Sequence, residues 1–237
     1  YKLTYTLSDA FGNTTSLTIP IKGKEQIIPA PNTENAEPFH WNSDNRFGAK
    51  GVRLSISRGN LYNDFYFRYS VKEDSVGLSD IHQLHDKPLP LHKNAQLSIR
   101  IQQDTLDNKQ QYGIVRIHKG RPSWVGGNYR NGWIDADIRE LGTFAIRQDI
   151  KEPVITPLNK ETWISKQRFM FRLTDNLSGV RTYRGEIDGQ FALFEMDNKS
   201  VITYHFDKER LSRGQHTLKL TVTDACGNEA VYTQPFS

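Results

Sequence analysis

The stretch "LTVTDACGNEA" at residues 220–230 shares its Asp-Ala-x-Gly-Asn core with the stretch "YTLSDAFGNTT" at residues 5–15. Ahead of each core, apolar residues alternate with polar ones, which is the period of a half-buried β-strand. The Asp can accept hydrogen bonds from backbone N–H groups of a turn, and Gly-Asn tolerates positive φ. Each copy therefore predicts a β-hairpin closed by an Asp-anchored turn. The predicted turn residues are Asp9, Gly12, Asn13, Asp224, Gly227 and Asn228.

The second copy is preceded by a complete set of strand signals. Between residues 151 and 237, short alternating segments are separated by turn signals such as "DNLSG" (175–179) and "DG" (188–189). About six or seven short strands of this kind are typical of an immunoglobulin-like sandwich. We therefore predict such a domain over residues 151–237. Its predicted turn residues also include Asp175, Gly179, Asp188 and Gly189.

The rest of the chain follows the same pattern. A lone hairpin is marginal in water, so we expect residues 1–27 to be the closing hairpin of a preceding immunoglobulin-like domain. The polar, proline-containing stretch 25–38 is predicted to be a linker or strand crossover. Strand-like segments then recur to about residue 149 without sustained helical period, which predicts a middle β-sandwich over residues 31–150. The predicted fold class is all-β, with tandem β-sandwich domains.

Composition excludes several classes of function. The net charge of +4 comes from interspersed basic and acidic residues, so no basic footprint for nucleic acid is present. No apolar run is long enough to predict a membrane-spanning helix. The one cysteine, Cys226, excludes an intrachain disulfide. The sequence also lacks GxSxG and a phosphate-binding glycine loop, and we expect no cofactor.

Three features of the sequence also allow a specific functional interpretation, as a metal site or a sugar-binding surface. The Asp residues of the turns could bind calcium, but one carboxylate per turn is too few ligands, so a structural turn is favoured. Residues 78–86 could form one short helical turn, and a metal site at His82, His85 and His92 would need residues 82–86 to be helical. Surface or loop histidines are the plainer interpretation. The aromatic stretch "SWVGGNYRNGW" (123–133) could stack on sugar rings through Trp124, Tyr129 and Trp133, although core or inter-strand packing of Trp124 and Trp133 is the favoured interpretation.

Several segments resemble a known family of envelope proteins. They are "GVRLSISRGNLYNDFYFRYSV" (51–71), "PLPLHKNAQLSI" (88–99), "ELGTFAIRQDIKEPVITPLN" (140–159), "LSGVRTYRGEIDGQFALFEMDNK" (177–199) and "GQHTLKLTVTDACGNEA" (214–230). Together they are similar to the C-terminal, non-catalytic region of lysostaphin-type (LytM-like) zinc peptidases of Bacteroidetes, which cleave peptidoglycan cross-links. The family's zinc motif pairs His-x-x-x-Asp with His-x-His. The first half occurs here as His40/Asp44 and His82/Asp86, but His-x-His is absent.

The resemblance implies a non-enzymatic accessory, spacer or docking region of a cell-envelope peptidase, located in the periplasm or envelope. Its implied partners are an N-terminal peptidase domain of the same protein, cell-wall glycan or an envelope protein, with no nucleic acid. The alternative function is a glycan- or peptidoglycan-binding module that uses the exposed aromatic surface. No catalytic or metal-binding residue of the family can be assigned to this chain.

The junction "FAIRQDIKEPVITP" (144–157) contains two prolines and no glycine or serine. Pro153 and Pro157 restrict φ and bias their predecessors to extended backbone, whereas a flexible tether would be rich in Gly and Ser. We therefore predict a short, stiff connection between the two sandwiches.

Overall fold

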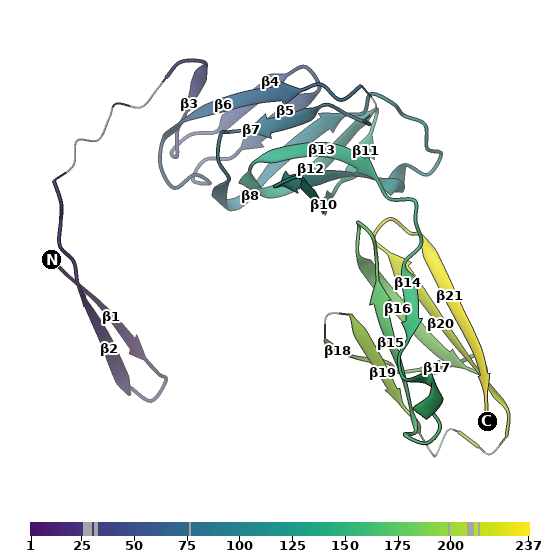
Figure 1. The fold of residues 1–237 in the computed structure, drawn as a ribbon. Coiled ribbons are helices and arrows are strands. Elements are labelled where there is room, and N and C mark those ends of the chain that lie inside the picture. The colour runs from purple at the N-terminus through teal and green to yellow at the C-terminus, as the bar shows by residue number, and fades with distance from the viewer. Residues whose placement is uncertain (26–29, 31–32, 76, 199, 208–210, 213) are drawn as a thin grey trace. The chain divides into compact units, whose positions relative to one another are not determined.

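The computed structural model describes residues 1–25, 30, 33–75, 77–198, 200–207, 211–212 and 214–237. Almost all regular structure in it is β-strand (Figure 1). Helix in the described residues is confined to two 3₁₀ turns, η1 (Lys109–Gln111) and η2 (Lys160–Thr162). The chain forms two compact units, residues 1–34 and 35–237. The prediction of an all-β chain with tandem β-sandwich domains is confirmed.

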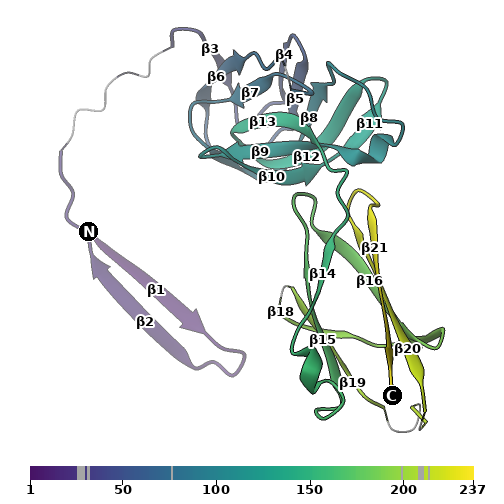
Figure 2. The same cartoon turned by 45° about the vertical axis from the view of Figure 1, so that its right-hand side comes forward.

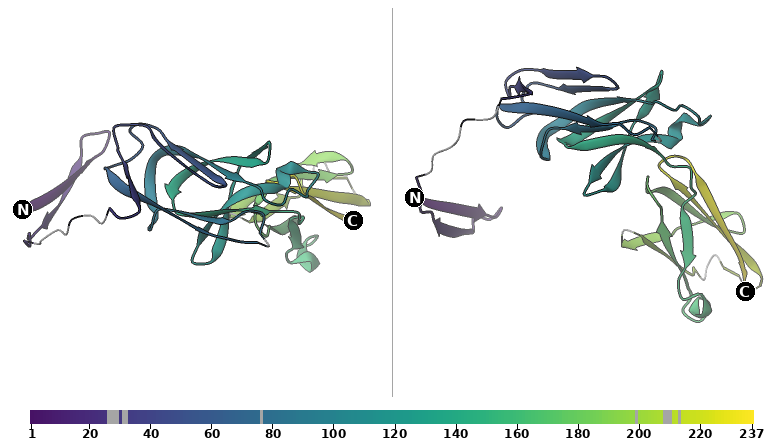
Figure 3. Two further views of the ribbon diagram at one scale, coloured as in Figure 1. Left: turned by 90° about the horizontal axis from the view of Figure 1, so that it is seen from above. Right: turned by 45° about the horizontal axis from the view of Figure 1, so that its top comes forward.

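The first unit contains an antiparallel hairpin of β1 (Lys2–Ser8) and β2 (Thr14–Pro20), seen as a two-stranded ribbon in Figure 3. Hydroxyl pairs Thr4–Thr18 and Thr6–Ser16 link the two strands on one face, at 3.2 and 3.0 Å. The other face presents apolar side chains, of which Tyr5 is 59% exposed. The predicted linker overlaps residues 26–29 and 31–32, which lie outside the described part.

The middle domain is a sandwich of two antiparallel sheets. The six-stranded sheet has the order β10-β9-β13-β7-β6-β3, and the five-stranded sheet has the order β11-β12-β8-β5-β4. The strands of the first are β3 (Ala36–Phe39), β6 (Phe65–Lys72), β7 (Ile81–Leu84), β9 (Tyr112–His118), β10 (Arg121–Gly126) and β13 (Thr143–Gln148). Those of the second are β4 (Asn45–Ala49), β5 (Val52–Ile56), β8 (Leu89–Arg100), β11 (Asn128–Arg130) and β12 (Trp133–Leu141).

Side chains of both sheets meet in one hydrophobic core. Leu97 and Ile134 enter it from the five-stranded sheet, and Phe67 and Phe144 enter from the six-stranded sheet; each is at most 1% exposed. Because successive strand residues alternate between faces, burial of these positions places the residues between them on the outer faces. That alternation decides which polar side chains gather on the surface.

The C-terminal domain is the predicted immunoglobulin-like sandwich (Figure 2). One sheet contains β14 (Val154–Pro157), β15 (Arg168–Thr174), β19 (Val201–His205) and β18 (Glu195–Asn198). The other contains β17 (Gln190–Ala192), β16 (Val180–Ile187), β20 (His216–Asp224) and β21 (Glu229–Phe236). Its core brings Phe169 and Phe171 of the first sheet against Leu218 and Leu220 of the second, all fully buried.

The structure excludes the helical turn that the metal alternative needed, and it shortens the predicted linker. Residues 81–84 form strand β7, and no helical turn forms over residues 78–86, because β7 pairs with β6 and β13. The last part of the predicted linker, residues 36–38, belongs to strand β3, which pairs with β6. In both places the sequence is short and polar, and pairing to a neighbouring strand decides the conformation.

Candidate functional site

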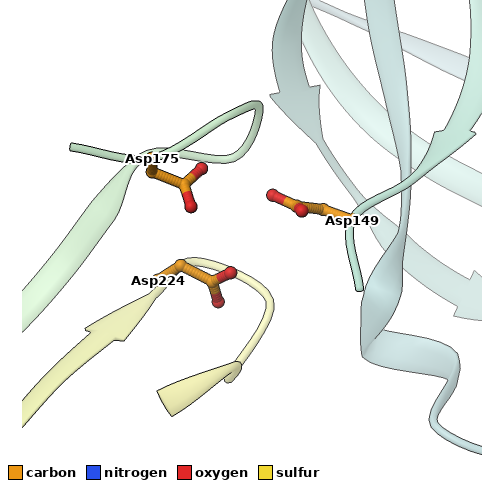
Figure 4. Close-up of side chains that lie close together, drawn as sticks. All are labelled: Asp149, Asp175 and Asp224. Carbon is orange, nitrogen blue, oxygen red and sulfur yellow. The ribbon is translucent and has the colours of Figure 1, made fainter. Parts of the chain in front are cut away.

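The most distinctive group of polar side chains lies at the junction between the two sandwiches. Asp149 follows β13, Asp175 follows β15, and Asp224 ends β20. Figure 4 shows the three carboxylates pointing toward one another from three separate loops. One oxygen of each lies within 4.8 Å of an oxygen of the others, and we call these residues the junction cluster. Folding therefore assembles three carboxylates that the sequence distributes over 75 positions (149 to 224).

The Asp224 turn is the second copy of the repeated phrase. Oδ1 of Asp224 accepts hydrogen bonds from the backbone N–H groups of Cys226 and Asn228, each at 2.8 Å. Oδ2 accepts from the Asn228 side-chain amide at 2.7 Å. Gly227 has φ +84°, a left-handed conformation that favours glycine. The turn is thus held by its own Asp and Asn side chains.

The first copy has the same internal geometry. Oδ1 of Asp9 accepts from the backbone N–H groups of Phe11 and Asn13, each at 2.9 Å, and Oδ2 accepts from the Asn13 amide at 2.8 Å. Gly12 has φ +84°. The strand register is also equivalent, because Leu3 pairs with Ile19 as Leu218 pairs with Gln234, 215 residues later in both strands.

Asn228 also reaches out of its turn to the middle domain. Its side-chain amide donates to the main-chain carbonyl of Asp149 at 3.0 Å. Its Oδ1 accepts from the side-chain amide of Gln111 at 2.6 Å, just before β9. Asn228 is 8% exposed, so these bonds are shielded from water. A buried amide that satisfies both its donor and its acceptor fixes the two loops against each other.

The Asp149 carboxylate makes the reciprocal contacts. Oδ2 accepts from the backbone N–H of Ser178 at 2.8 Å, and Oδ1 accepts from the Asn176 side-chain amide at 3.2 Å. Both donors belong to the β15–β16 loop, where Oδ2 of Asp175 accepts from the N–H groups of Leu177 and Gly179. The middle domain is therefore hydrogen-bonded to two loops of the C-terminal domain, through Asp149 and Gln111.

The junction cluster brings three carboxyl groups together, two of them in fully buried residues. Asp149 and Asp224 are each 1% exposed, and the buried Oδ1 atom of Asp175 has no hydrogen-bond partner among the described residues. Burial, together with the nearby carboxylates, raises the pKa of the Cys226 thiol to about 11. This thiol is therefore neutral at physiological pH and is a poor nucleophile.

A divalent cation such as Ca²⁺ could be held by these three carboxylates, but it takes six to eight oxygen ligands. Both oxygens of Asp149 and Asp224, and one oxygen of Asp175, already accept hydrogen bonds from loop N–H groups and amides. These hydrogen bonds give each of the three Asp residues a structural role, because each carboxylate anchors a loop.

The three aromatic residues predicted as a sugar platform do not share a face. Tyr129 packs against the core on the inner face of the five-stranded sheet, and its hydroxyl donates to Asp104 at 2.8 Å. Trp133 is on the outer face of that sheet, one residue before buried Ile134. Trp124 is on the other sheet, where its indole covers Gly113. The outer face of the five-stranded sheet has a hollow of 920 Å³, and of the three aromatic residues only Trp133 lines it.

The histidines predicted as a metal alternative are also separated. His82 is 1% exposed, and its Nδ1 lies 2.8 Å from the Tyr69 hydroxyl. His85 lies beyond the strand with φ +75°, beside the ring of Phe65. His92 lies beside Tyr62, with ring centroids 5.9 Å apart. A helical turn would have placed His82 and His85 on one face, and the strand removes that arrangement.

The remaining predicted turn, Asp188-Gly189, connects β16 to β17. Both residues have positive φ, +50° and +79°. Oδ1 of Asp188 accepts from the backbone N–H of Thr217 at 2.8 Å, and Oδ2 lies 2.6 Å from Nδ1 of His216. The hydrogen bond to Asp188 raises the pKa of His216. Sequence reasoning identified the turn but missed its histidine partner, which is 28 residues away.

Comparison with known families finds one match within the chain. Residues 36–149 match the family described as the Zu5-like domain. The matched segment begins with β3 and ends at Asp149, so it coincides with the middle sandwich and covers slightly less than half of the chain. No curated protein matches the chain. Among the described residues, no helix is both long and apolar enough to cross a membrane.

Proposed function

We propose that this chain is a non-catalytic spacer or docking region whose two sandwiches are held in a fixed arrangement. The observation that carries the proposal is the buried hydrogen bond from the Asn228 amide to the Asp149 carbonyl. It joins the closing hairpin of the C-terminal domain to the residue that follows β13, the last strand of the middle domain. A module that must hold a partner at a set position needs such a joint, whereas two domains that close on a substrate need a hinge.

The contacts around this bond support a stiff joint. Gln111, Asp149 and Asn228 form a continuous set of bonds from the middle domain into the C-terminal domain. Two loops of the C-terminal domain are engaged, so rotation about the connecting strand would break bonds on both sides. Breaking them would leave buried polar groups unpaired, at a cost of about 1–3 kcal/mol for each such group.

The cellular setting of the proposal rests on the sequence resemblance. Segments from both sandwiches resemble the non-catalytic region of peptidoglycan peptidases, which supports a place in the periplasm or cell envelope. In that setting the chain would position a peptidase domain of the same protein, or dock it to an envelope protein. The chain itself would not carry the peptidase chemistry, since the His-x-His half of the zinc motif is absent.

A distance measurement between the sandwiches tests the joint. Spin labels are attached at Arg121→Cys and Lys219→Cys, because both native side chains are exposed. The native thiol of Cys226 is buried and stays unlabelled. We expect a single narrow distance distribution by pulsed electron paramagnetic resonance, and a broader one in the Asn228→Ala variant.

The matched control is Asn13→Ala, which removes the same bond to the turn Asp in the first unit. It should leave the distribution between the sandwiches narrow. A distribution that is already broad in the native chain would overturn the spacer proposal, because the joint would then not hold the domains in place.

A further inference from the structure

The outer face of the five-stranded sheet is built almost entirely from polar side chains. Its core-facing positions are apolar and buried, as at Leu54, Leu97 and Ile134. The alternate positions point outward, and they carry a guanidinium, amides, a hydroxyl and carboxylates. The outward residues used below are Arg53, Gln96, Ser98, Asn128, Asp135 and Asp137. Trp133 is the large apolar side chain among them.

Strand register places these residues side by side. Asn128 pairs with Asp135, Asp135 with Ser98, Ser98 with Arg53, and Arg53 with Gly48. The row therefore crosses all five strands of this sheet. At about 4.8 Å between neighbouring strands, it is roughly 19 Å long. Gly48 has no side chain and nothing within 4 Å of its Cβ position, so the row is open at that end.

The face is hollowed along this row. A hollow of 920 Å³ is lined by Arg53, Gln96, Ser98, Asn128, Trp133 and Asp135, among others. A second hollow of 410 Å³ continues it over β4 and shares three of those residues, Arg53, Gln96 and Ser98. The two together form a groove across the strands, which suits an extended ligand better than a compact one. We call it the outer-face groove.

Several side chains of the groove already contact one another. Oγ of Ser98 donates to Oδ1 of Asp135 at 2.6 Å, and Nε of Arg130 lies 3.5 Å from Oδ2 of the same carboxylate. The guanidinium of Arg53 is stacked on the Trp133 ring, 4.2 Å from its centroid. Groups that are ordered before a ligand arrives lose less conformational entropy when it binds.

We propose that the outer-face groove binds a neutral oligosaccharide. A sugar ring offers hydroxyl groups that donate and accept at once, and planar amide, carboxylate and guanidinium groups can engage neighbouring hydroxyls in pairs. A sugar ring also offers an apolar C–H face, which can pack on the part of the half-buried Trp133 indole that the Arg53 guanidinium leaves uncovered. The groove supplies both kinds of partner within one row, and its length accepts several linked rings.

Charge decides between this ligand and its alternatives. Asp135 and Asp137 line the groove and would repel a polyphosphate or another polyanion, while Arg53 and Arg130 would repel a cationic peptide. Across both hollows three arginines, Arg46, Arg53 and Arg130, accompany the two aspartates, so the charges of the lining nearly balance. A near-neutral lining favours a ligand without net charge. This inference goes beyond the spacer role, since the groove is on one sandwich and does not involve the junction.

Isothermal titration calorimetry on the full chain tests the proposal. The probes are two neutral tetrasaccharides, cellotetraose and N-acetylchitotetraose, and an inorganic polyphosphate of similar length. We expect saturable binding of at least one tetrasaccharide and none of polyphosphate. Trp133→Ala should weaken that binding about tenfold, the order of magnitude of one aromatic contact, and Asn128→Ala should weaken it severalfold.

Trp41→Ala is the matched control, because Trp41 is an exposed tryptophan outside the groove. It should leave affinity unchanged, and the thermal unfolding curve of each variant verifies that it is folded. Three results would overturn the proposal: neither tetrasaccharide binds, binding survives both Trp133→Ala and Asn128→Ala, or polyphosphate binds in the groove in their place.

Discussion

The side-chain amide of Asn228 lies 3.0 Å from the main-chain carbonyl of Asp149, although the two residues are 79 positions apart and belong to different sandwiches. The same amide lies 2.7 Å from Oδ2 of Asp224 in its own turn. One amide group thus shapes the hairpin and attaches it to the neighbouring domain. This double role makes the closing hairpin a structural joint.

Asn228→Ala should lower the stability of the C-terminal domain by about 2 kcal/mol, since it removes buried hydrogen bonds and leaves polar partners unpaired. Differential scanning calorimetry of the full chain measures this as a lower melting temperature. Asn13→Ala, which alters the equivalent turn of the first unit, should leave the melting temperature of the C-terminal domain unchanged. Equal melting of native chain and Asn228→Ala would show that the joint contributes nothing to stability.

Asp175→Asn should raise the melting temperature in metal-free buffer, by an amount corresponding to less than about 1 kcal/mol. The substitution removes one of three mutually repelling carboxylates and replaces the unpartnered Oδ1 by a donor or acceptor amide. The gain should change little with salt, because bulk ions screen buried carboxylates only weakly. A melting temperature of the native chain that rises with added CaCl₂, together with a loss in Asp175→Asn, would contradict this expectation.

Gly113→Ala should destabilise the middle domain by about 1–3 kcal/mol, as overpacking commonly does. A methyl group on Gly113 would overlap the indole of Trp124. Urea unfolding measures the loss, and the double variant Gly113→Ala, Trp124→Ala should recover part of it by removing the overlap. If Gly113→Ala is neutral, the indole does not pack on the sheet, and Trp124 becomes available as a binding surface.

The His216–Asp188 pair should make stability depend on pH. The hydrogen bond to Asp188 raises the pKa of His216 above its ordinary 6.5, so the folded state favours protonated histidine. That stabilisation is complete below pH 6.5 and is lost as pH rises through the raised pKa. The stability difference between the native chain and His216→Gln should therefore shrink as pH rises above 6.5.

Asp188→Asn provides the control for this titration, since it keeps the acceptor for Thr217 and removes the charge. It should weaken this pH dependence in melting experiments, and the Ser212 carbonyl, 2.9 Å from Nε2 of His216, should retain part of it. If the stability difference between the native chain and His216→Gln grew as pH rose, the pH dependence would have the opposite sign. That result would refute its assignment to the His216–Asp188 pair.

The purified chain should hold no stoichiometric zinc and should not hydrolyse peptidoglycan. The prediction rests on the absent His-x-His motif and on the separate positions of His82 and His85. Elemental analysis and a turbidity assay on cell-wall sacculi measure the two outcomes. Tight zinc that disappears in a His82→Ala, His85→Ala variant would prove the prediction wrong.

The sequence by itself determined the fold class and the form of the turns, because both depend on local physics. Alternation such as Leu218, Leu220, Val222 specifies one buried face of a strand whatever its partner. The Asp-Ala-x-Gly-Asn phrase specifies its own turn, because its side-chain hydrogen bonds come from the Asp and Asn and the other donors are backbone N–H groups of the same turn. Asp9 and Asp224 therefore adopt one geometry in two different surroundings.

Only the tertiary structure decided which chemistry-bearing residues meet. Asp149, Asp175 and Asp224 converge because strand ends from two domains come together, and no local pattern encodes that distance. The groove likewise depends on register, since a shift by one residue would move Ser98 and Asp135 to the buried face. For the same reason Tyr129 and Trp133, close in sequence, end on opposite faces of one sheet. Register and loop convergence are long-range properties, and they set the sites of this protein.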